Sequence, residues 1–116
     1  MIKDSQQLGV FLKAEANRTG VRLAFDTHYD AQNWQLSWWQ GATLHCLDFQ
    51  PLAHGDLSVS RSKNKFKFLP RLLHWAHNTI PMFPYLAQVE RSNLGTEHFP
   101  LQETTIASFV SSSIHA

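Results

Sequence analysis

Hydrophobic residues near the start of the chain recur at the spacing of a helix. Leu8 and Leu12 fall on one face of such a helix. Asp4, three residues before Gln7, has the position of the first residue of a capping box, which supplies partners for amide groups in the first helical turn. The pattern predicts an amphipathic helix that begins after Asp4. We expect Gly20 to end it, because glycine adopts positive φ at little cost.

Alternating apolar and polar residues follow this helix. Residues 21–26 and 34–49 both show the period of two that is typical of half-buried strands. Within the longer segment, Gln40-Gly41 separates two alternating runs and indicates a two-residue hairpin turn. In that register Trp39 pairs with Ala42.

The two faces of the predicted hairpin differ in their hydrophobic content. The richer face carries Trp34, Leu36, Trp38, Thr43, His45, Leu47 and Phe49. The weaker face carries Gln35, Ser37, Trp39, Leu44 and Cys46. Because both faces are partly apolar, we expect a second layer, a subunit or a ligand to cover the weaker one.

The next segment predicts two short strands and a helix. A strand begins at Leu57, and residues 62–65 are interpreted as a turn that leads into a second strand. Pro70 suits the first turn of a helix, where its missing N–H costs nothing, and Pro81 should stop that helix. The expected buried face of this helix consists of Leu69, Leu72, Leu73, Ala76 and Ile80.

The last third of the chain predicts one strand and one helix. Residues 85–89 could form a strand, and the apolar residues after Pro100 have helical spacing. The sum is an α+β fold: an antiparallel sheet of about four to five strands with two to three helices, mainly packed on one face. This order of elements resembles that of the small secretion chaperones, although those proteins are typically acidic.

The composition agrees with a single compact domain over residues 1–116. Hydrophobic residues make up 43% of the chain and charged residues 16%, which excludes a disordered segment. The only cysteine, Cys46, excludes an internal disulfide framework. No apolar run approaches the roughly 20 residues that span a bilayer, and the polar start is unlike a secretion signal. We therefore expect a cytoplasmic location and no membrane association.

Charge is distributed unevenly along the chain. The net charge is only +1, yet residues 57–89 contain five cations and no acid, a charge of +5. The remaining residues contain five cations and nine acids, a charge of −4. Such polarity bears on the choice of partners more than the sum does.

The cations gather over residues 61–71. In an extended strand Arg61, Lys63, Lys65 and Lys67 would project from one face, and Arg71 follows them in the predicted helix. A row of cations at about 6–7 Å spacing could follow the phosphates of a nucleic acid. The alternative is an edge strand whose lysines repel the edge of another sheet.

Histidine and cysteine are the candidates for chemistry. His74 and His77 are close enough on the predicted helix to share a metal, but no spacing in the sequence supplies the third ligand that zinc needs, so we expect two solvated histidines, no metal site and no cofactor. His45, expected opposite Leu36, and Cys46 point to opposite strand faces and cannot form a nucleophile–base pair. We expect both to belong to the core.

Three functions remain open. No phosphate-binding loop, nucleophile elbow or spaced carboxylate pair is present, so we expect no catalytic residue and favour a non-catalytic intracellular module that binds another macromolecule, most simply a protein, or forms a homodimer. Its candidate contacts are the basic residues 61–71 and the Trp38-Trp39 pair. One indole of this pair should be core, and the other, on the weaker face, is either an exposed binding residue or buried under a helix. The alternatives are nucleic-acid binding through the basic residues, and small-molecule binding or catalysis by the histidines.

Overall fold

A five-stranded sheet with three helices forms the part of the chain that the computed structural model describes, residues 2–26, 33–66, 70–80 and 91–115. In chain order the elements are α1 (Ser5–Thr19), β1 (Arg22–Asp26), β2 (Asn33–Gln40), β3 (Thr43–Pro51), the short 3₁₀ helix η1 (Ala53–Gly55), β4 (Asp56–Lys65), α2 (Pro70–Thr79), β5 (Arg91–Pro100) and α4 (Glu103–Ile114).

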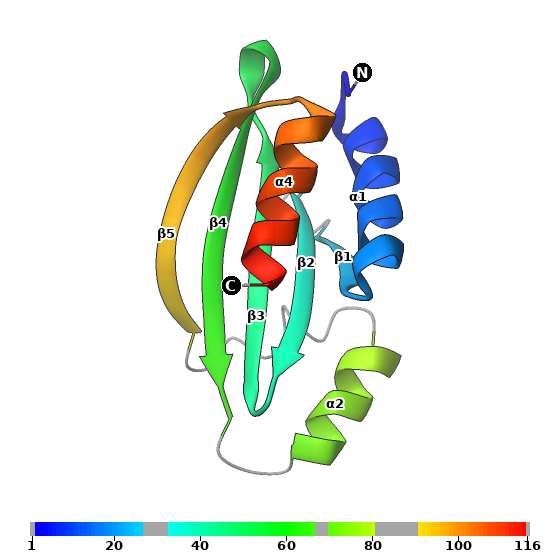
Figure 1. The fold of residues 1–116 in the computed structure, drawn as a ribbon, viewed down its shortest axis with the longest axis vertical. Helices are drawn as coiled ribbons and strands as arrows, with labels where there is room; N and C mark the ends of the chain where they lie inside the picture. Colours follow the sequence, from blue (N-terminus) through cyan, green and yellow to red (C-terminus); the bar gives the residue numbers. More distant parts are fainter. Residues whose placement is uncertain (1, 27–32, 67–69, 81–90, 116) are drawn as a thin grey trace.

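All neighbouring strands are antiparallel, in the order β1-β2-β3-β4-β5. Helices α1 and α4 lie side by side on one face of this sheet, and α2 lies at the end of the β2–β3 hairpin (Figure 1). The expected α+β class, the antiparallel sheet and the packing of helices mainly on one face are confirmed. Four strands precede α2, because β4 runs through residues 62–65 where the sequence suggested a turn between two strands.

The main core lies between the sheet and the pair α1 and α4. Its largest fully buried side chains come from one face of each element, as the alternation of apolar residues predicts. The core residues include Leu8 and Leu12 of α1, Leu36, Leu47, Phe49, Leu57 and Val59 of the sheet, and Ile106, Phe109 and Val110 of α4.

Both predicted ends of α1 are confirmed. The Asp4 carboxylate accepts a hydrogen bond of 2.8 Å from the backbone N–H of Gln7. Gly20 follows the last turn with φ of 76° and donates its backbone N–H to the Ala16 carbonyl. A side chain at Gly20 would be strained by this φ, so the glycine fixes where the chain leaves the helix.

A second, smaller core lies on the opposite face of the sheet. There Leu44 and Cys46 are buried against Ala76, and Trp39, Phe66 and Leu73 pack around them. This is the weaker face of the hairpin, and α2 is the layer that covers it. The expectation that Cys46 is a small core hydrophobe is confirmed, since it is a buried thiol.

The turn of the hairpin is shifted by one residue from the predicted position. Gln40 pairs with Thr43, so the turn is Gly41-Ala42, and Gly41 has φ of 62°. Pairing consequently moves by two positions, and His45 lies opposite Trp38 instead of Leu36. A shift of two keeps every side chain on its predicted face, which is why the two faces were assigned correctly.

In the second half of the chain one strand prediction is wrong and one strand was missed. Residues 62–65 do not turn, because β4 continues through Lys65 and pairs with β3 on one side and β5 on the other. The strand β5 was not predicted, since exposed polar side chains dominate it and leave no alternation to detect. The strand expected at 85–89 lies outside the described residues.

Helix α2 begins at Pro70 as predicted, but its buried face is rotated. Leu72 and Ile80, expected in the core, are exposed to 55% and 37%, while His77, expected in solvent, is only 3% exposed. The small residue Ala76 and the half-buried Leu73 join His77 on the covered face. Trp39 and Ser37 of the sheet provide the aromatic and polar surface that this imidazole contacts.

Close approach of α1 to the sheet depends on Gly9. A Cβ built at this buried position would come within 2.1 Å of the Trp34 ring. That ring is also fixed by its indole N–H, which donates to the Ser5 carbonyl at 3.0 Å. Helix α1 thus lies directly on the indole.

We predict that Gly9→Ala destabilises the protein, although the same change stabilises an ordinary helix by roughly 0.5–1 kcal/mol. Overpacking against Trp34 should lower the free energy of unfolding by about 1–3 kcal/mol in urea titrations. Val10→Ala, one residue away and 70% exposed, is the control and should change it by less than about 0.5 kcal/mol. An unchanged or higher stability of Gly9→Ala would show that the helix can move away from the sheet.

Candidate functional site

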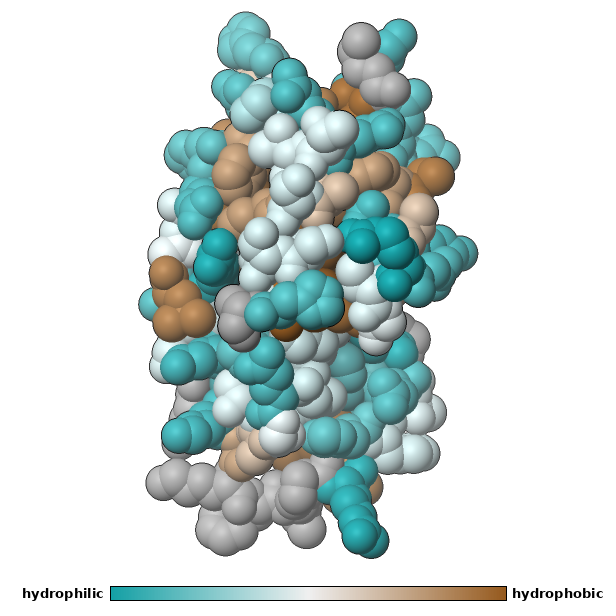
Figure 2. All heavy atoms as spheres, viewed as in Figure 1, coloured by the Kyte–Doolittle hydropathy of each residue, from teal (hydrophilic) through white to brown (hydrophobic). Residues whose placement is uncertain are grey.

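Helices α1 and α4 do not cover the whole of their sheet face. Helix α4 ends at Ile114, and the strands β2, β3 and β4 extend beyond that end towards α2 (Figure 1). We call the helix-side surface formed there by Trp38, Gln40, His45, Lys63 and Lys65 the open half of the sheet. In the space-filling view of this face, hydrophobic atoms gather around α1 and α4, and the lower half is mostly hydrophilic (Figure 2).

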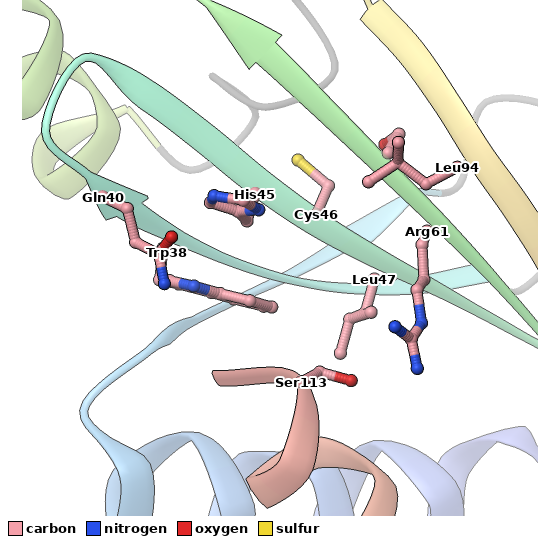
Figure 3. Close-up of a pocket in the computed structure, with 9 residues that line it drawn as sticks. Trp38, Gln40, His45, Cys46, Leu47, Arg61, Leu94 and Ser113 are labelled. Atoms are coloured by element: carbon pink, nitrogen blue, oxygen red, sulfur yellow. The ribbon is translucent and has the colours of Figure 1, made fainter. Parts of the chain in front are cut away.

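A cavity of about 170 Å³ lies where the open half meets the end of α4. Trp38 and His45 lie on one side of it, Arg61 and Leu94 lie on the other, and Ser113 of α4 closes one end (Figure 3). The complete lining is Trp38, Gln40, His45, Cys46, Leu47, Arg61, Ser62, Leu94 and Ser113.

A flat aromatic pair forms one wall of the cavity. The rings of Trp38 and His45 are paired across β2 and β3 and stack at 5.5 Å between centroids with an angle of 12°. Partial burial lowers the pKa of His45, and the ammonium group of Lys63, its neighbour on β4, lowers it further. The imidazole is therefore neutral at pH 7, and the positive charge of this wall comes from Lys63.

Arg61 supplies a fixed cation on the opposite side. Its guanidinium lies over the ring of Phe109, 4.7 Å from the centroid, and one of its nitrogens is 3.5 Å from the Glu97 carboxylate. The Nε nitrogen of the same side chain is buried and has no acceptor. The buried indole Nε1 of Trp38 also has none. Buried donors are normally paired, so two such groups beside one cavity are unusual.

A β-bulge shapes the rim of the cavity. The pairing of β4 with β5 shifts between Arg61 and Ser62, which leaves Leu94 as the extra residue and 51% exposed. Gly95, opposite Arg61, has φ of 113°, and its N–H donates to the Asn93 side chain at 3.0 Å. A Cβ at Gly95 would meet nothing within 4 Å, so the space in front of Gly95 is open. Bulges of this kind redirect side chains beside functional sites.

The structure brings together three of the five predicted basic residues. Arg61, Lys63 and Lys65 alternate along β4 and share the helix-side face, as expected from the strand period. Lys67 lies outside the described residues, and Arg71 lies on α2, away from the row. The description of this row as a strand edge is wrong, because β4 lies between β3 and β5. Its lysines therefore do not protect an edge.

The two tryptophans are on opposite faces, as expected, and both are half-buried. Trp39, on the weaker face, is covered by α2 and stacks on His74 at 4.4 Å between centroids. Trp38, on the richer face, packs partly against the main core and lines the cavity.

The histidines of α2 support the fold. His77 shares a hydrogen bond of 2.7 Å with Ser37, whose side chain is completely buried. His74 contacts the Gly41 carbonyl through Nε2 at 3.2 Å. Although Ser37 and His77 resemble a nucleophile and its base, no solvent reaches them.

Among the described residues there is no group of three potential metal ligands, and no helix long and apolar enough to cross a bilayer.

Sequence reasoning missed Leu94, Ser113 and the burial of His77. The sequence Asn93-Leu94-Gly95 has the composition of a bulge, but its partner strand was not identified. Spacing gave a signal for His77, because Leu73, Ala76 and His77 share one helical face.

Comparison with known proteins adds nothing to these assignments: no family model, curated protein or solved structure matches this chain.

We predict that acid weakens the attachment of α2. Burial lowers the pKa of His77 to about 4, with smaller effects from Arg22 and His74, so the folded protein holds this imidazole neutral. The unfolded chain takes up the proton near pH 6.5. The free energy of unfolding should therefore fall as pH decreases from 6.5 to 4, by up to about 1.4 kcal/mol per pH unit from this group.

Denaturant titrations at several pH values compare the wild type with His77→Gln, which keeps a polar side chain but cannot titrate. The variant should be less stable at pH 7 and should lose this part of the pH dependence. Parallel profiles for the two proteins between pH 6.5 and 4.5 would contradict the assignment to His77.

Proposed function

We propose that this protein is a non-catalytic module that binds an acidic segment of a protein partner through the open half of the sheet. The observation that carries the proposal is the shared face of exposed Lys63 and Lys65 with the half-buried Trp38 and the exposed Leu94 at its rim. Lysines attract carboxylates and accelerate association, while an aromatic residue in a pocket supplies binding energy. A peptide segment with acidic residues around one apolar side chain can place its carboxylates near the lysines and its apolar side chain against Trp38.

A protein partner fits this surface better than a nucleic acid. Affinity for nucleic acid depends on the number of phosphates that cations neutralise. Arg61 lies over Phe109 at the cavity, and Arg71 belongs to α2 and not to the row. Two exposed lysines on β4 then remain at this surface among the described cations.

The structure supports self-association less than the sequence does, because the sequence left the weaker face of the hairpin uncovered. Helix α2 packs on that face. Small-molecule chemistry by several histidines also loses support, since of the described histidines His45 alone lines the cavity. The proposal includes a cytoplasmic location, which the single buried thiol of Cys46 favours, since reducing compartments keep thiols in this state.

The test is selection of a random phage-displayed peptide library on the immobilised protein, followed by fluorescence anisotropy with the selected peptides. We expect enrichment of peptides with several Asp or Glu residues around an apolar residue, with affinity that falls as salt increases. Lys63→Glu together with Lys65→Glu should weaken binding by at least about tenfold, because two attractive contacts become repulsive.

The matched control is Lys3→Glu together with Lys13→Glu, which makes the same change in net charge at two exposed lysines near and on α1. Peptides should bind this variant like the wild type. Equal losses in both variants would attribute binding to net charge and overturn the proposal. A single-stranded oligonucleotide that binds the open half more tightly than any selected peptide would also overturn it, and would assign the surface to nucleic acid.

A further inference from the structure

The cavity beside Trp38 has the size of a small ring. Its volume of about 170 Å³ compares with the roughly 150 Å³ in which a protein cavity accommodates benzene. Leu47 and Leu94 contribute aliphatic surface, and the stacked Trp38–His45 pair contributes a flat wall. Flat aromatic groups stack well on such a wall, which favours a planar ring over a branched aliphatic group.

The polar groups of the cavity favour a ligand that accepts hydrogen bonds. Trp38 Nε1 and Arg61 Nε can only donate, both are buried, and neither has an acceptor. Leaving a buried donor unpaired costs about 1–3 kcal/mol, so a ligand that gives either nitrogen an acceptor would recover part of this energy.

Charge in and around the cavity favours an anionic acceptor. Arg61 is a permanent cation, and Lys63 lies beside His45 on the same face. The acid near them among the described residues is Glu97, at 3.5 Å from Arg61 and half exposed, and a surface pair of this kind contributes little. A carboxylate suits a donor such as an arginine N–H better than a neutral carbonyl does.

We propose that this cavity binds an aromatic carboxylate, with the ring against Trp38 and His45 and the carboxylate on the guanidinium of Arg61. The group can belong to a free small molecule of benzoate size or to a peptide that ends in an aromatic residue. The inference shares Trp38 and Leu94 with the acidic-peptide proposal. It differs in its decisive group, because it needs Arg61 and the cavity, whereas that proposal needs both Lys63 and Lys65.

The experiment follows the indole N–H resonance of Trp38 in the ¹⁵N-labelled full chain during titrations. Trp38→Phe identifies that resonance. Benzoate should shift it saturably, and benzamide, which has the same ring without the charge, should bind at least about tenfold more weakly. A peptide with a C-terminal phenylalanine and its amidated form make the same comparison for the peptide source. Tighter binding of the peptide than of benzoate assigns the site to a chain terminus, and the reverse assigns it to a small molecule.

Two variants locate the binding. Arg61→Gln should weaken benzoate by at least about tenfold, but it also removes the contact with Phe109. Leu94→Glu avoids this difficulty, because the residue is exposed at the rim, where a carboxylate would repel the ligand. Leu52→Glu, at another exposed leucine, is the control and should bind benzoate like the wild type.

Three results would overturn the proposal: no saturable shift of the Trp38 resonance at millimolar benzoate, equal affinity for benzoate and benzamide, or equal affinity of the Leu94→Glu and Leu52→Glu variants. If acidic peptides still bind in a manner dependent on Lys63 and Lys65, such a result rejects the aromatic carboxylate alone. Benzoate binding without any selected acidic peptide would reject the other proposal alone.

Discussion

The alternation of side chains in β2 and β3 is the constraint on which the rest of the structure depends. Every second residue of the hairpin faces α1 and α4, and the others face α2. Because both sets contain large apolar residues, the sheet needs protein on both sides. Helices α1 and α4 end before the strands do. Their face of the sheet therefore stays uncovered beyond them, at the open half (Figure 1).

Much of this fold could be predicted from the sequence because the signals were local. The cap at Asp4, the glycine after α1 and the apolar spacing of α4 each depend on a few neighbouring residues. The turn at Gly41 was misplaced by one position, since both Gln40-Gly41 and Gly41-Ala42 supply a glycine. What the sequence could not reveal was the partner of β5, because a strand with exposed side chains on both faces has no period.

The candidate site was predicted in part for the same reason. The alternation of side chains in an extended strand is enough to predict that Arg61, Lys63 and Lys65 share one face. The cavity, by contrast, combines β2, β3, β4, β5 and the end of α4, and no local pattern reports which side chains of five elements meet. The choice between Trp38 and Trp39 likewise depended on where α2 packs. His77 is an example of what local patterns miss. The sequence suggested a solvated histidine, but the Ser37 hydroxyl supplies a hydrogen bond that allows the imidazole to lie in the interior.

The order of the elements along the chain has a consequence for how the protein acquires its binding site. Strands β1 to β4 form a meander in which each strand pairs with its predecessor, so their pairing closes short loops and costs little chain entropy. The cavity is completed by Leu94 of β5 and Ser113 of α4, the last two elements of the chain. During synthesis the sheet can therefore begin to assemble well before the site exists. The cavity is therefore completed late in folding, and a chain that stops short of β5 would carry the lysines of β4 without the cavity beside them.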